Sequence, residues 1–90
     1  MIHLPKLKFI GGDLNVMGNL DVNESHFPNL ETIEGDLITA KSGFKKLPQN
    51  LKRIGGRLII SKSDPTSFID DLILGLENGL VIKGDIYYCD

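Results

Sequence analysis

The chain has 90 residues, of which 41% are hydrophobic and 24% are charged, with a net charge of −2 at neutral pH. This length suits one domain over residues 1–90, and the charge balance excludes a generally polybasic nucleic-acid binder and a strongly acidic DNA mimic. No apolar run approaches the roughly 20 residues of a membrane span, and the first residues lack the basic-then-apolar order of a secretory signal. We therefore expect a cytoplasmic protein that does not enter a membrane.

Cysteine and histidine are too few for the usual disulfide or metal frameworks. The single cysteine, Cys89, has no internal disulfide partner, which fits a reducing compartment. His3 and His26 show no metal-ligand spacing, and the sequence has no nucleophile elbow, glycine-rich phosphate loop or HExxH motif. We therefore expect no metal, no cofactor and no enzymatic activity.

Four segments of the chain align on one glycine and predict a repeat. The aligned glycines are Gly12, Gly35, Gly56 and Gly84, at spacings of 23, 21 and 28 residues. An isoleucine stands two residues before each glycine, and a leucine or isoleucine stands two residues after it. These two columns are Ile10, Ile33, Ile54 and Ile82, and Leu14, Leu37, Leu58 and Ile86.

The repeat predicts a short solenoid. A unit of this size cannot bury its apolar face alone, so successive units must stack with both columns inside. Strands that follow the glycines would then pair in parallel, in one sheet of about four strands. Glycine is expected where the chain bends and a side chain would collide with the neighbouring unit.

Two segments carry a family resemblance. Residues 14–19, Leu-Asn-Val-Met-Gly-Asn, fit LxLxxN, and residues 47–58 fit LPxxLxxIGGxL. The pattern resembles the leucine-rich repeat, in the short degenerate form found in many bacteriophage and bacterial proteins. The resemblance implies an α/β repeat fold, and a fold alone does not define a function.

Residues 61–79 interrupt the repeat and predict a helix over 65–77. Asp64 and Pro65 suit the start of a helix, and Gly79 suits its end. Apolar residues follow a helical period at Phe68, Ile69, Leu72, Ile73 and Leu76. We expect this apolar face to cover the core or to cap an open end of the stack.

Side chains alternate along a strand, so residues one, three and five after each glycine are predicted to point outward. The first two outward columns give the predicted partner-binding residues, Asp13, Asn15, Asp36, Ile38, Arg57, Ile59, Asp85 and Tyr87. The third column is Met17, Ala40, Ser61 and Cys89. An apolar stripe of Ile38, Ile59 and Tyr87 rimmed by charge is typical of a protein-binding surface. Alternatively, strand propensity alone accounts for the stripe, or the helix covers it.

Seven of the ten basic residues lie within residues 37–63, where there is no acidic residue. They are Lys41, Lys45, Lys46, Lys52, Arg53, Arg57 and Lys62. Such a band could contact phosphates or an acidic protein surface, or it could be an ordinary solvated surface. Only one aromatic residue, Phe44, lies among these basic residues, which disfavours binding of single-stranded nucleic acid.

These patterns favour a non-enzymatic protein-binding module. Because the repeat resembles those of phage proteins, the resemblance implies a more specific hypothesis, a small phage-encoded inhibitor in the host cytoplasm that occludes a host-defence complex of the CRISPR–Cas type. A homodimer through the last strand or the apolar stripe is also expected. The alternatives are a nucleic-acid or phosphate binder that uses the basic band, and an enzyme built on the column of Asp13, Asp36 and Asp85.

Overall fold

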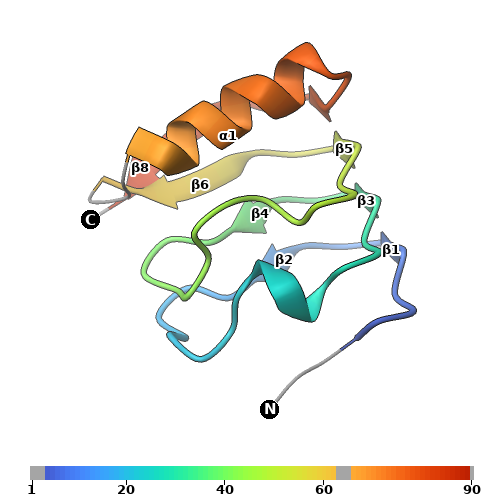
Figure 1. Cartoon of the computed structure of the whole chain (residues 1–90), viewed down its shortest axis with the longest axis horizontal. Coiled ribbons are helices and arrows are strands. Elements are labelled where there is room, and N and C mark those ends of the chain that lie inside the picture. The colour runs from blue at the N-terminus through green and yellow to red at the C-terminus, as the bar shows by residue number, and fades with distance from the viewer. Residues whose placement is uncertain (1–3, 63–65, 90) are drawn as a thin grey trace.

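The computed structural model describes residues 4–62 and 66–89 (Figure 1). In these residues eight short strands form two parallel sheets of four strands each, accompanied by one α-helix. One sheet has the order β1-β3-β5-β7, and the other has the order β2-β4-β6-β8. The protein therefore has an α/β fold in which each repeat unit contributes one strand to each sheet.

The first sheet contains β1 (Phe9–Ile10), β3 (Thr32–Ile33), β5 (Arg53–Ile54) and β7 (Val81–Ile82). The second sheet contains β2 (Leu14–Asn15), β4 (Leu37–Ile38), β6 (Leu58–Ser61) and β8 (Ile86–Cys89). The connections carry a 3-10 helix, η1 (Glu24–His26), and an α-helix, α1 (Thr66–Glu77). We call the four strand pairs, in chain order, the first to fourth units.

The strand register confirms both predicted inner columns. In the second sheet Leu14 pairs with Leu37, Leu37 with Leu58, and Leu58 with Ile86. The isoleucines of the first sheet pair in the same way, and the members from the second and third units are fully buried. Ile86 differs because β8 is an edge strand, and 37% of this residue is exposed.

The prediction of a single sheet is wrong, because the glycine bend divides each unit into two strands. Residues 11–13 bend between β1 and β2, so the isoleucine before the glycine and the leucine after it lie on strands of different sheets. Both side chains still reach the same core, which contains Ile33, Leu37, Ile54 and Leu58.

The predicted helix is present as α1, at the end of the stack away from the N-terminus (Figure 1). Its Phe68 and Leu72 are buried in the same cluster as Leu58 and Ile60, so α1 covers the core from the inner side of the second sheet. Gly79 follows with a φ of 105°, a conformation that favours glycine and ends the helix. The predicted start at Asp64 and Pro65 lies outside the described residues. Within the described part of the chain, no helix has the length and apolar character needed to cross a membrane.

Candidate functional site

The structure places the predicted apolar stripe on the outer face of the second sheet. The register aligns Asn15 with Ile38, Ile38 with Ile59, and Ile59 with Tyr87. Ile38 and Ile59 are half-buried, Asn15 is exposed, and Tyr87 is 45% exposed. These four side chains therefore form one row on the face opposite the buried leucines. We call this surface the outer face.

The helix does not cover the outer face. Phe68 and Leu72 of α1 pack into the core beside Leu58, whereas Ile38 and Ile59 belong neither to that cluster nor to the half-buried residues packed against it. Since neighbouring residues of a strand point to opposite faces, α1 lies on the other side of the second sheet. The alternative in which the helix covers the stripe is therefore wrong.

The prediction for the third outward column is wrong at two of its four positions. Met17 is exposed, but Ala40 and Ser61 are buried. Ile60 and Ser61 are both buried although they are consecutive residues of β6. The Ser61 hydroxyl accepts the backbone N–H of Lys41 at 2.6 Å, which compensates for its burial.

The predicted aspartates join successive units. Asp13 Oδ1 accepts the backbone N–H of Asp36 at 2.7 Å, and Asp36 Oδ1 accepts the backbone N–H of Arg57 at the same distance. A Cβ atom at Gly35 or Gly56 would overlap the carboxylate of the preceding unit. At the first two junctions, the carboxylate that follows one glycine thus lies against the glycine of the next unit. We call this series of bonds the carboxylate ladder.

Arg57 interrupts the carboxylate ladder, because a guanidinium group cannot accept a hydrogen bond. Its Nη2 donates instead to Asp36 Oδ2 at 2.9 Å, and its Cζ atom lies 5.8 Å from the centre of the Tyr87 ring. The bond from Arg57 lowers the pKa of the Asp36 carboxyl below its usual 3.8. Asp85 accepts from the Tyr87 hydroxyl at 3.3 Å. Charged and polar groups therefore border the apolar row on the outer face.

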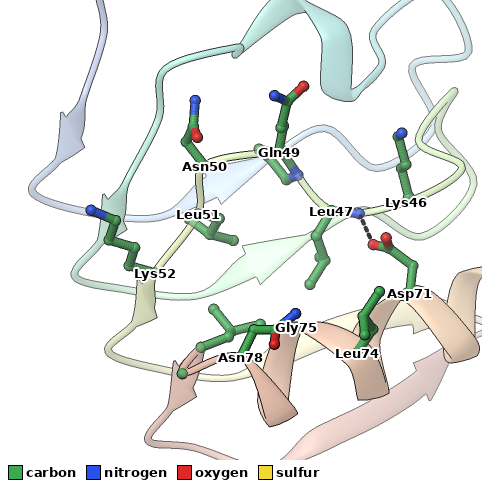
Figure 2. Close-up of a pocket in the computed structure, with 13 residues that line it drawn as sticks. Lys46, Leu47, Gln49, Asn50, Leu51, Lys52, Asp71, Leu74, Gly75 and Asn78 are labelled. Atoms are coloured by element: carbon green, nitrogen blue, oxygen red, sulfur yellow. Dashed lines mark hydrogen bonds between the residues drawn. The ribbon is translucent and has the colours of Figure 1, made fainter.

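A groove that the sequence does not predict lies between residues 46–52 and α1 (Figure 2). This groove has a volume of about 540 Å³. The backbone N–H of Leu47 donates to Asp71 Oδ2 at 3.2 Å and joins the two walls. Leu74 of α1 lines the groove and is 56% exposed.

The groove forms where α1 replaces a shorter connection. Asn50 Nδ2 donates to the Pro28 carbonyl at 2.7 Å, and Asn29 donates in the same way to the Pro5 carbonyl. These bonds hold successive connections together. In the next connection α1 occupies the corresponding place, and its Asp71 accepts the backbone N–H of Leu47. In the sequence, Gly56 and Gly84 are 28 residues apart, whereas the earlier glycines are 23 and 21 residues apart. This longer spacing indicates that the third connection differs from the first two.

The basic residues surround the third unit and do not gather on one face. Lys46 and Lys52 lie toward opposite ends of the groove (Figure 2), while Arg57 lies on the outer face. Lys52 Nζ is 3.7 Å from Glu31 Oε1. Lys41, Lys45 and Lys62 are exposed and Arg53 is half-buried.

The described residues show no metal-binding group, and known proteins give no family for this chain. In residues 4–62 and 66–89 no group of three or more histidine, cysteine, aspartate or glutamate side chains is arranged to hold a metal ion. No protein-family model matches the chain, and comparison with curated proteins and with solved structures gives no significant match.

Proposed function

We propose that the chain is a non-enzymatic protein-binding module, built on a leucine-rich-repeat-like solenoid, that binds its partner through the outer face. The observation that carries this proposal is the alignment of Ile38, Ile59 and Tyr87 in one row outside the core. The parallel stacking of four similar units supports the solenoid description.

The outer face has the chemistry of a protein interface. Ile38 and Ile59 can lose further water on binding, and tyrosine and arginine are the residue types that dominate binding energy in many interfaces. Arg57 is held by Asp36 and by the Tyr87 ring, so less side-chain freedom is lost when a partner binds. The row is also rigid, since each of its residues belongs to a hydrogen-bonded strand.

The preferred partner is a protein surface of a host-defence nucleoprotein complex. The repeat's resemblance to phage proteins supports this choice. In this proposal the module acts by occupying a surface that the complex needs, so its own residues carry out no chemical step.

The proposal is tested by capturing proteins from bacterial cytosol on the immobilised wild-type chain and on two variants. Ile59→Asp places a charge in the outer face, and Leu74→Asp places the same charge in the groove. Circular dichroism first establishes that all three proteins are folded. We expect a partner that wild type and Leu74→Asp retain and that Ile59→Asp loses. If Ile59→Asp retains the same proteins as wild type, the outer face is not the partner-binding site.

A further inference from the structure

The two ends of the stack carry complementary features that the outer face does not use. At the N-terminal end, a Cβ atom at Gly12 would meet no atom within 4 Å, whereas the equivalent position at Gly35 is filled by the Asp13 carboxylate. The backbone N–H of Asp13 has no hydrogen-bond partner in the described residues, while the equivalent N–H of Asp36 has one. The N-terminal end thus has the glycine and the backbone N–H of a junction, but no carboxylate lies against them.

The C-terminal end presents the opposite half of that junction. The Asp85 carboxylate occupies the ladder position after Gly84, and its described contact is with the Tyr87 hydroxyl. Ile86 belongs to an inner column, and Tyr88 pairs with the buried Ile60. Nothing in the described chain stacks on β8 at its outer edge, so Tyr88 is 56% exposed.

Apolar shape is also matched between the ends. The N-terminal end has a hollow of about 360 Å³, which opens onto the ends of the inner columns. Its lining includes Leu4, Leu7, Ile10, Leu14 and Val16. Ile86 ends the inner column that begins with Leu14, and Tyr88 lies two residues after Ile86 as Val16 lies two residues after Leu14. Stacking would therefore place Ile86 over Leu14 and Tyr88 over Val16.

Charge favours contact between opposite ends. Lys6 and Lys8 are exposed beside the N-terminal hollow. On α1, which lies at the end of the stack away from the N-terminus (Figure 1), Asp70 and Glu77 are exposed. Contact between two C-terminal ends would bring these acidic groups together, whereas contact between unlike ends sets them against the lysines.

We propose that a second copy of this chain stacks head to tail on the first, with the N-terminal end of one copy on the C-terminal end of the other. The Asp85 carboxylate accepts the Asp13 N–H of the next copy and lies against its Gly12. Ile86 and Tyr88 cover the N-terminal hollow. This proposal does not use the apolar row of Ile38, Ile59 and Tyr87, although Asp85 borders that row, and it stands independently of the proposed function.

A head-to-tail contact does not close on itself, so it predicts a series of growing assemblies and not a single dimer. Sedimentation of the purified wild-type chain over a wide concentration range is expected to show a mass that rises steadily with concentration. Because lysine–carboxylate pairs contribute, added salt is expected to lower that mass.

Two variants each block one end. Gly12→Glu leaves the monomer unstrained, because the space beside Gly12 is open, but it collides with Asp85 of the neighbouring copy and repels it. Ile86→Lys places a charge in the C-terminal surface at a residue that is already 37% exposed. Each variant alone is expected to remain a monomer. An equimolar mixture is expected to form dimers and nothing larger, since each partner offers one intact end.

Three results would overturn the proposal. The first is a wild-type chain that remains monomeric at every concentration. The second is Gly12→Glu that still self-associates, which would indicate a symmetric contact between C-terminal ends. The third is a mixture of the two variants that contains only monomers although both are folded by circular dichroism. Ile59→Asp serves as a control and is expected to assemble like wild type.

Discussion

The first two junctions of the stack and the third are held together differently. Between the first three units, a carboxylate accepts the next unit's N–H, and the strands of the second sheet pair over two residues. At the third junction Arg57 ends the carboxylate ladder, but β6 and β8 pair over four residues. The helix α1 also adds Phe68 and Leu72 to the core there. Stacked units can therefore be joined by polar bonds at the bend or by longer strands and a helix.

The largest expected effect is a difference in stability between substitutions on the two faces of β6. Leu58 is fully buried, so Leu58→Asp places an unpaired charge in the core. This change is expected to cost about 5 kcal/mol or more and to unfold the chain. Ile59→Asp on the outer face is expected to leave it folded. Urea unfolding followed by circular dichroism distinguishes the two variants, and the reverse result would mean that the strand faces are interchanged.

A smaller effect separates two glycines of the same motif. Gly35→Ala inserts a methyl group where the Asp13 carboxylate and the Gly12 backbone lie, and it is expected to cost about 1–3 kcal/mol. Gly12→Ala meets open space and is expected to change stability by less than about 0.5 kcal/mol. Equal losses for the two variants, measured by urea unfolding, would contradict the role given to the carboxylate ladder.

The pH dependence of unfolding tests the ladder electrostatically. The pKa of Asp36 is lowered in the folded chain, so its contribution is complete above the ordinary value of 3.8 and is lost as the pH falls through the lower, folded value. Asp36→Asn removes this titration. The gap in unfolding midpoint between wild type and variant should therefore be constant near neutral pH and narrow below about pH 3.8. If the difference in unfolding midpoint stays constant down to the lowest pH, the negative charge of Asp36 does not contribute to stability.

The smallest effect is expected at Gly75, within α1. Gly75→Ala improves helix propensity by about 1 kcal/mol. The new methyl group lies 3.3 Å from Leu80 Cδ2, at the end of a flexible side chain that must shift slightly. We expect a net gain of less than about 1 kcal/mol in thermal or urea unfolding. A clear loss would mean that α1 cannot adjust against the core.

The sequence predicts the inner columns because apolar residues recur at a fixed distance from each glycine. The sequence does not predict the second sheet. A glycine such as Gly12 is compatible both with a bend inside one strand and with a bend that separates two strands, and the repeat pattern is the same in both cases. Alternation also predicts that Ala40 and Ser61 are exposed, but both are buried. Ala40 follows the end of β4, and the Ser61 hydroxyl accepts the N–H of Lys41 from the neighbouring connection.

The site was predicted in part. The row of Ile38, Ile59 and Tyr87 follows from the repeat register, but the ladder bonds of Asp13 and Asp36 depend on how closely units approach. The recurring glycine–aspartate pair was the available signal for those bonds. The groove could not be predicted, because it depends on where α1 lies against residues 46–52.

The equivalence of the first two junctions makes residues 35–55 a natural template for engineering the length of the protein. Inserting a tandem duplicate of this 21-residue stretch after Gly55 preserves every glycine–aspartate pair and adds one strand to each sheet. The duplicated chain should fold to a particle taller by one strand spacing, about 4.8 Å, and small-angle scattering can measure that increase. Height could then be set by the number of inserted copies, with Arg57 and α1 always finishing the array.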